Sequence, residues 1–157
     1  MTVTGGQLMV GGMGSWGDST DGLVVLPDGR RVRGRGLRSG PPMEDAVPEL
    51  GIYLTGRRYA ASAWPSVWIQ WPDFGVPRHR SEALAVLRHA YQRAAEQRVE
   101  IACGAGVGRT GTAIALLARM AGVPAAEAVG WAQTHYRARA AETPWQRRFV
   151  VTADLDG

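Results

Sequence analysis

One segment in the middle of the chain restricts its fold more than any other. Residues 99–102 (VEIA) predict a short buried strand, and residues 109–121 predict an apolar helix that ends at Gly122, a residue suited to a helix C-cap. Between them lies a loop, residues 103–108, in which every second residue is glycine. A strand that passes through such a loop into a helix predicts strands and helices packed in layers around one core.

Short apolar runs earlier in the chain predict the other strands of a small sheet. These runs lie at residues 23–26, 31–37, 51–54 and 66–70. Pro27, Asp28 and Gly29 are typical turn residues, because proline presets φ and glycine accepts a positive φ. The first two runs are therefore expected to form a hairpin.

Apolar residues spaced three and four apart predict three further helices. The first begins at Ser81, its candidate N-cap, and runs to about residue 94. The second opens with Pro124 as its first residue, and the last has Thr143 as its cap and Pro144 in its first position. Together with the strands, this order predicts an α/β fold, a small central β-sheet flanked by helices.

The length of 157 residues fits one domain, because two would have cores too small to be stable. Residues 1–22 contain seven glycines and little periodicity, which predicts a flexible leader. Residues 23–157 are then expected to form a single domain.

All eighteen basic residues are arginine, and the absence of lysine excludes several kinds of site. A standard phosphate-binding NTPase loop, a Schiff base and a protein kinase each need a lysine. Arginine, whose planar fork binds phosphate or carboxylate, is the cation that remains. The net charge is +4, but the arginines are scattered apart from a cluster at residues 30–38. With no accompanying nucleic-acid motif, no nucleic-acid partner is expected.

Cysteine and apolar patterning predict a cytoplasmic setting. Cys103 is the one cysteine, so no internal disulfide can form. The chain has no apolar run long enough to span a membrane, and residues 1–22 lack the pattern of a secretory signal, so no membrane partner is expected. The three histidines lack metal-ligand spacing, and neither a metal nor a cofactor is expected.

The glycine-rich loop has the chemistry of an anion site. Glycines allow successive backbone N–H groups to point inward, and the following helix adds its positive N-terminal end. Cys103 stands at the start of this loop, where the thiolate, the nucleophilic form of cysteine, is favoured. Arg109 follows six positions later and can bind two phosphate oxygens as a fork.

Three motifs carry a resemblance to a known family and together cover about residues 66–150. Residues 103–111 (CGAGVGRTG) resemble the Cys-x5-Arg-Thr/Ser-Gly signature of cysteine-based protein tyrosine phosphatases. Residues 71–77 (WPDFGVP) look like the mobile acid loop of that family, and residues 142–149 (ETPWQRRF) are similar to its water-positioning segment. The resemblance is to the small bacterial type, and it implies that residues 23–157 form a phosphatase domain.

The resemblance implies a role for each matched residue. Cys103 would attack phosphorus and form a phosphocysteine, Asp73 would protonate the leaving group and then activate water, Thr110 would donate to the sulfur, and Gln146 would position the water. The phosphate would be bound by the Arg109 guanidinium and by a run of backbone N–H groups, those of Gly104, Ala105, Gly106, Val107, Gly108 and Arg109. The implied substrate is a phosphotyrosine protein or another phosphomonoester, with dual specificity left open.

The chain departs from the family pattern in two places, and two other functions remain open. Ala102 stands where the family has histidine, and Glu142 stands where it has glutamine; Glu142 is expected to pair with an arginine. The segment 57–59 (RRY) is a weak counterpart of the family's recognition loop. The alternatives are a catalytically weak phosphate-binding pseudophosphatase and a dinucleotide-binding module, since Gly106, Gly108 and Gly111 also fit the dinucleotide fingerprint.

Overall fold

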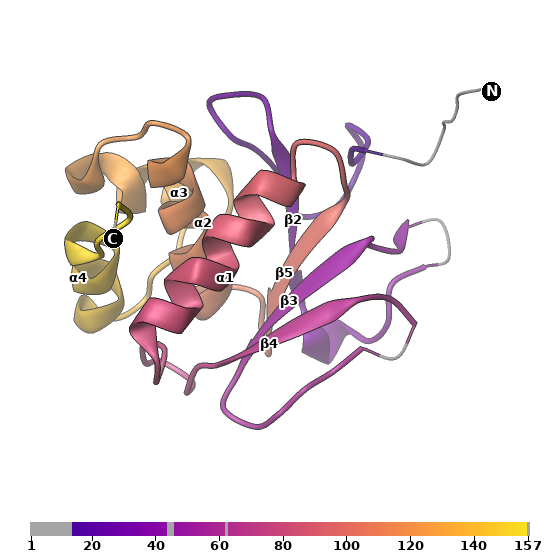
Figure 1. Ribbon diagram of the computed structural model, residues 1–157, viewed down its shortest axis with the longest axis horizontal. Coiled ribbons are helices and arrows are strands. Elements are labelled where there is room, and N and C mark those ends of the chain that lie inside the picture. The colour runs from indigo at the N-terminus through magenta and orange to yellow at the C-terminus, as the bar shows by residue number, and fades with distance from the viewer. Residues whose placement is uncertain (1–13, 44–45, 62, 157) are drawn as a thin grey trace.

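The computed structural model describes residues 14–43, 46–61 and 63–156 and shows a five-stranded mixed sheet packed by helices (Figure 1). The strand order across the sheet is β1-β2-β5-β3-β4. The strands are β1 (Leu23–Val25), β2 (Arg31–Gly36), β3 (Leu50–Thr55), β4 (Ser66–Gln70) and β5 (Val99–Cys103). All five lie where the apolar runs predicted them, and β1 and β2 form the expected antiparallel hairpin.

The strands β2, β5, β3 and β4 run parallel to one another, and this direction gathers their carboxyl ends at one edge. Cys103, the last residue of β5, pairs with Gly36 at the end of β2. Residues 71–77 leave the end of β4 at the same edge. Ligand sites of open parallel sheets lie at this edge. The topology therefore brings the predicted phosphate loop (residues 103–109) and the predicted acid loop (residues 71–77) into one region.

The helices follow the predicted order, with two differences at their starts. The elements are α1 (Arg80–Arg93), α2 (Gly108–Met120), α3 (Ala128–His135) and α4 (Pro144–Thr152), with the short 3-10 turns η1 (Leu37–Ser39) and η3 (Ala125–Glu127). The prediction of Ser81 as N-cap is wrong: His79 holds that position without a side-chain cap bond, and Ser81 lies inside the first turn. Pro124 is the N-cap of η3 rather than the first residue of a helix.

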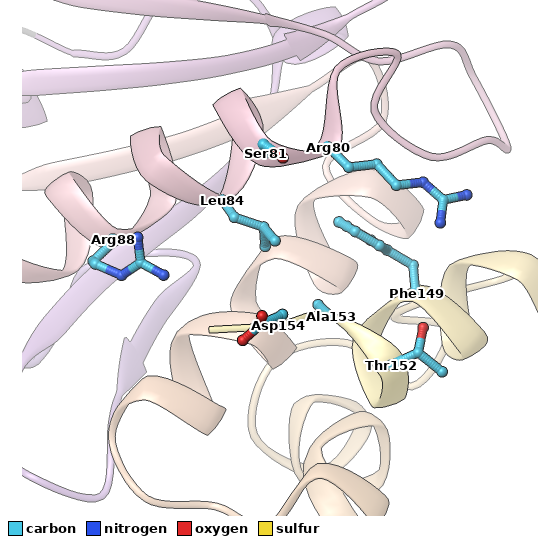
Figure 2. A pocket seen from close by; sticks show the side chains of 8 residues that line it. All are labelled: Arg80, Ser81, Leu84, Arg88, Phe149, Thr152, Ala153 and Asp154. Carbon is cyan, nitrogen blue, oxygen red and sulfur yellow. The ribbon is translucent and has the colours of Figure 1, made fainter. Parts of the chain in front are cut away.

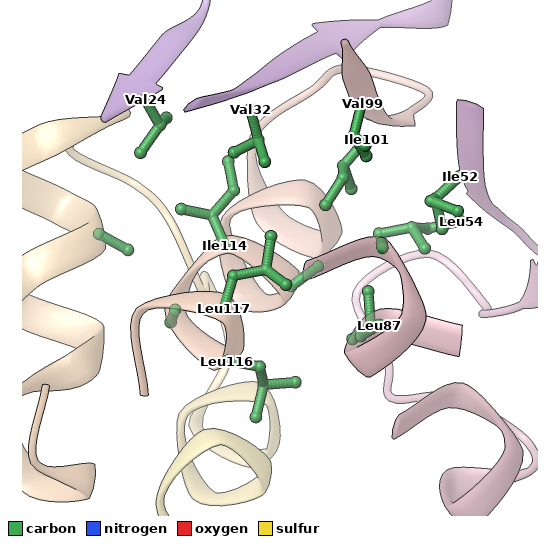
Figure 3. Packing of buried hydrophobic residues seen from close by; sticks show 14 of the residues in the cluster. Val24, Val32, Ile52, Leu54, Leu87, Val99, Ile101, Ile114, Leu116 and Leu117 are labelled. Atoms are coloured by element: carbon green, nitrogen blue, oxygen red, sulfur yellow. The ribbon is translucent and has the colours of Figure 1, made fainter. Parts of the chain in front are cut away.

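The four α-helices lie together on one side of the sheet (Figure 1). Helix α2 is at the centre of this layer, and its residues 113–118 are fully buried. Ile114 and Leu117 point toward Val32, Val99 and Ile101 of the sheet (Figure 3). The predicted α/β fold is confirmed, and the burial of α2 places its N-terminus rigidly at the carboxyl edge of the sheet.

The opposite face of the sheet holds a buried charge network. Glu100 of β5 is fully buried. Its side chain points away from the helices, because its neighbours in the strand, Val99 and Ile101, face them and successive side chains alternate. Its carboxylate accepts hydrogen bonds from Arg33, from Arg35 Nε at 2.7 Å and from the Tyr53 hydroxyl at 2.8 Å. Burial opposes ionisation, but the hydrogen bonds from Arg35 and the nearby arginine charges hold the pKa of Glu100 below its ordinary value. The network joins β2, β3 and β5 three residues before Cys103.

Part of the expected leader is packed on the sheet. Residues 1–13 lie outside the described residues, but Trp16 is 3% exposed and its indole N–H donates to Val99 O at 2.9 Å. The Arg33 guanidinium lies 4.1 Å from the centre of the same indole. Within residues 14–22, this one large side chain therefore both buries apolar area and satisfies a strand carbonyl, and the division into a flexible leader and a domain that begins at residue 23 stays a prediction. Within the described residues, no helix is long and apolar enough to cross a membrane.

Candidate active site

The phosphate loop begins at Cys103, whose side chain is 2% exposed at the end of β5. The Gly106 N–H donates to Cys103 Sγ at 3.3 Å, so one backbone amide of the loop already points at the predicted nucleophile. Gly106 has a φ of +75°, and a Cβ there would lie 2.6 Å from the backbone nitrogen of Gly36. Only glycine fits both the left-handed backbone and the close approach to β2.

Tyr136, which directly follows α3, supports this loop from behind. Its hydroxyl donates to the carbonyl of Gly106, and a Cβ at Gly34 would overlap its ring. Because the peptide bond is trans, binding the Gly106 carbonyl on one side directs the N–H of Val107 toward the other. Burial raises the pKa of the Tyr136 hydroxyl above its ordinary value, which keeps it a donor. Sequence reasoning missed Tyr136, since no local pattern relates it to a loop thirty residues away.

We expect Tyr136→Phe to lower kcat/KM for phosphomonoesters about 5- to 30-fold, the effect of losing one buried hydrogen bond that orients a loop peptide. Inorganic phosphate should bind more weakly by a similar factor, measured by competitive inhibition. Tyr91→Phe is the matched control, because Tyr91 bonds to Asp28 and Arg30 and not to the phosphate loop. Unchanged phosphate affinity in Tyr136→Phe would show that the hydroxyl does not orient the loop.

Arg109 links the two predicted loops. Its side chain is nearly buried, and its Nη1 donates to Trp71 O at 3.1 Å while its Nη2 lies 3.3 Å from Asp73 Oδ1. Asp73 is half exposed, so its carboxyl is reachable from solvent at the mouth of the loop. The structure therefore brings Cys103, Arg109 and Asp73 together and shows the acid loop closed against the phosphate loop.

Trp71, the first residue of the acid loop, holds this loop against helix α4. It is fully buried, its indole N–H donates to Gly75 O at 2.6 Å, and its ring meets Phe149 of α4 edge-on with centroids 6.1 Å apart. The Arg80 guanidinium lies over the Phe149 ring, 5.6 Å from its centroid. Figure 2 shows Arg80 and Phe149 at the wall of a pocket of about 310 Å³ between α1 and α4. The loop is thus packed on helices at its base.

The first turn of α4 holds the tip of the acid loop. Thr143 Oγ1 donates to Phe74 O at 3.1 Å, the Trp145 indole N–H donates to the same carbonyl, and Gln146 Nε2 donates to Gly75 O at 3.0 Å. Phe74 has a φ of +61°, a strained conformation for a residue with a side chain. Three donors thus hold two adjacent carbonyls and keep Phe74 in this conformation.

Gln146 is fully buried, and both ends of its amide are occupied. Besides the bond to Gly75, its Oε1 accepts from the Thr143 N–H at 3.2 Å, while Thr143 Oγ1 accepts from the Gln146 N–H, which completes a capping box. The predicted cap at Thr143 and Pro144 is confirmed. In this conformation Gln146 holds the acid loop, and the role toward water that the resemblance implied for it stays a prediction.

We expect Trp145→Phe to lower kcat about 3- to 10-fold with little change in KM, because the variant removes one donor that stabilises the closed acid loop. Steady-state kinetics with an aryl phosphate measures both constants. Val151→Ala is a suitable control, since Val151 is exposed on the same helix and makes no hydrogen bond to the acid loop. An unchanged kcat in Trp145→Phe would contradict a stabilising role for this bond.

Two other predicted residues border the phosphate loop, Thr110 in α2 and Glu142 just before the N-cap of α4. Thr110 Oγ1 is buried and, among the described residues, has no hydrogen-bond partner, so the expected bond to the Cys103 sulfur is not made in this conformation. The Glu142 carboxylate lies against Gly108, where a Cβ would overlap it, and its Oε2 pairs with Arg139 at 3.1 Å. The expected arginine partner of Glu142 is thereby confirmed, and the role of Thr110 stays a prediction.

The segment suggested as a recognition loop packs on the sheet. The Tyr59 ring lies 4.7 Å from that of Tyr53, and the Arg58 guanidinium lies 5.5 Å from the Trp68 ring. In the part of the chain that the structure describes, no hydrogen bond, ion pair or ring contact joins residues 57–59 to the phosphate loop. Nor do the described residues include a group of three or more His, Cys, Asp and Glu side chains that could hold a metal ion.

Comparison with known proteins agrees with this geometry. The family model for protein-tyrosine phosphatase matches residues 49–152, which include the acid loop, the phosphate loop and α4. The chain belongs to the protein-tyrosine phosphatase family. Human tyrosine-protein phosphatase non-receptor type 4 is 35% identical over 95 residues, 56% of this chain and 10% of that protein. Rat receptor-type tyrosine-protein phosphatase zeta is 49% identical over 51 residues, 31% of this chain and 2% of that protein.

A solved structure shares the fold of this phosphatase family member. The structure described as Tk-PTP in the active form is 20% identical, with a TM-score of 0.61 that covers 85% of this chain and 95% of that one. The two curated relatives, in contrast, are much longer, and this chain spans a tenth of their length or less. The agreement with them concerns the phosphatase segment alone.

Proposed function

We propose that this protein is a protein tyrosine phosphatase that hydrolyses phosphomonoesters through a phosphocysteine at Cys103. The observation that carries the proposal is the pair of contacts from Arg109 to Trp71 and Asp73, which sets a carboxyl group over the loop that holds the thiol. Nucleophile, anion-binding groups and acid are thus held in one site.

In the proposed reaction, Cys103 Sγ forms a bond to phosphorus as the bond to the phenolic oxygen of the substrate breaks. Asp73 gives its proton to that oxygen, so the product leaves as a neutral phenol. Water then attacks the phosphocysteine, Asp73 takes its proton, and inorganic phosphate leaves as the thiolate re-forms. Throughout, the Arg109 guanidinium and the loop N–H groups stabilise the charge on the three other oxygens.

Support for the alternatives is weaker. A dinucleotide-binding fold would continue with further strands after the glycine-rich loop, whereas the described residues after α2 form only helices and turns. A pseudophosphatase would bind phosphate without turnover, yet Cys103, Arg109 and Asp73 are all present and adjoining. We propose a reducing, cytoplasmic setting of the bacterial type, since one buried thiol must stay reduced to act.

Hydrolysis of a phosphotyrosine peptide tests the proposal. The protein should release phosphate from this peptide and from p-nitrophenyl phosphate, and vanadate should compete with both substrates. A phosphoserine peptide and a phosphoinositide in the same assay measure specificity. Phosphate binding without turnover would identify a pseudophosphatase, and binding of NAD with no competition by vanadate would identify a dinucleotide site; either result would contradict the proposal.

A further inference from the structure

A second arginine lies beside the phosphate loop and has no part in the chemistry above. Strand β2 ends at Gly36, and the turn η1 then carries Arg38 next to the end of β5. The Arg38 backbone N–H donates to Gly104 O at 3.0 Å. This bond fixes residue 38 to the carbonyl group of the residue that directly follows the predicted nucleophile.

The guanidinium of Arg38 lies close to that of Arg109. A Cβ at Gly104 would lie 3.2 Å from Arg38 Nη2 and 3.4 Å from Arg109 Nη2, so both cations border the same small volume. The Arg109 Nη2 atom is the one that faces Asp73 at the mouth of the loop. Glycine at position 104 thus leaves room for a second positive group at the entrance of the site.

Arg38 is exposed and free to bind a ligand. Within the described ranges, its guanidinium makes no ion pair or hydrogen bond. Its neighbours in the basic cluster are engaged, since Arg33 and Arg35 bind Glu100 and Arg35 also donates to Gly40 O. Two guanidinium groups this close repel each other, and an anionic ligand that lies between or beside them relieves the repulsion.

We propose that Arg38 selects substrates by binding the carboxylate of an acidic residue next to the phosphotyrosine. This inference rests on the proposed function and names a substrate class within it. The loop N–H groups and Arg109 are committed to the phosphate, and the loop itself, residues 104–108, carries no charge. Arg38 supplies a planar fork at the rim, where residues flanking the phosphotyrosine would lie, and a fork of this kind matches a carboxylate.

The test compares two phosphotyrosine peptides that differ only in the flanking residues, acidic in one and the corresponding amides in the other. Wild type should show a kcat/KM about 3- to 10-fold higher for the acidic peptide, mostly through KM, and salt should reduce this ratio. Arg38→Ala should bring the ratio to about one, and Arg38→Glu should reverse the preference. p-Nitrophenyl phosphate has no flanking residue, so its hydrolysis in Arg38→Ala measures the effect of the lost charge on the phosphate alone, and its kcat/KM should fall by less than that of the acidic peptide.

Arg148→Ala is the matched control, because it removes an equal charge from an exposed arginine on α4. It should keep the preference of wild type. Equal kcat/KM for the two peptides in wild type, or an equal loss for both in Arg38→Ala, would overturn the inference. Binding of the same peptides to Cys103→Ser separates it from the proposed function: a preference for the acidic peptide that depends on Arg38 would support the inference even if wild type showed no turnover.

Discussion

Cys103→Ser is expected to abolish turnover of phosphotyrosine and aryl phosphates, by at least about four orders of magnitude, while phosphate still binds. A serine hydroxyl at this site has no base to activate it, and it is a poorer leaving group than a thiolate in the second step. The loop N–H groups and Arg109 are untouched by the change, so the affinity for inorganic phosphate or vanadate should stay within a few-fold of wild type.

Steady-state assays and a phosphate titration together measure this result. The variant should unfold at nearly the same temperature as wild type, because the side chain is almost isosteric and a serine oxygen can accept the same hydrogen bond from the Gly106 N–H. Turnover in Cys103→Ser comparable to wild type would show that another group performs the chemistry. A loss of phosphate binding together with a lower unfolding temperature would mean that the loop itself had changed.

Asp73→Asn carries the second large expectation, a fall in kcat of about 10²- to 10⁴-fold on phosphotyrosine peptides. Asparagine keeps the size of the side chain and can still accept a bond from Arg109, but it cannot give a proton to the leaving oxygen. The loss should therefore be largest for basic leaving groups such as tyrosine and smaller for phenols acidified by nitro groups.

A series of aryl phosphates with leaving groups of different basicity measures this dependence. Wild type should show a shallow dependence of rate on leaving-group basicity, and Asp73→Asn a steep one. Asp18→Asn is the matched control, since Asp18 is 90% exposed and pairs with Arg31 at the far end of the sheet from Cys103. An equal slope in Asp73→Asn and wild type would remove Asp73 as the acid.

Local chemistry in the sequence predicted the parts of this site that depend on neighbouring residues. The apolar run, the alternating glycines and the helix start lie within thirteen residues of one another. The conformation of each part depends on the residues that form it, so each can be predicted from the local sequence. Thr143 and Pro144 predicted the start of α4 for the same reason, since a capping box is a contact between residues three apart.

Contacts between distant segments were not predictable in this way. Tyr136 acts on Gly106, Trp16 on Val99 and Arg38 on Gly104, and in each case the two residues meet only because the sheet is assembled. A glycine outside the loop can indicate that another group packs closely against the backbone there, but the sequence does not show which group it is. Gly34, for example, has no Cβ because the Tyr136 ring occupies that space.

The role of Gln146 illustrates a related limit. The resemblance assigned it to the hydrolytic water, but the structure shows its amide bound to Gly75 and Thr143. A motif indicates which residues gather at a site, whereas the hydrogen bonds that each side chain makes depend on how the loops close. Here, the position of the acid loop depends on the hydrogen bonds that Arg109 donates to Trp71 O and that Trp145 donates to Phe74 O.

Detection of the phosphocysteine is the most direct test of the central claim. Wild type is mixed rapidly with p-nitrophenyl phosphate, quenched in acid within milliseconds and cleaved after arginine, which yields the peptide of residues 99–109 with Cys103 as its single thiol. We predict one phosphoryl group on this peptide, absent from Cys103→Ser, and a constant partition of phosphate between water and an added alcohol for all aryl phosphates. Turnover with no phosphoryl group on this peptide and a partition that varies with the leaving group would contradict the account.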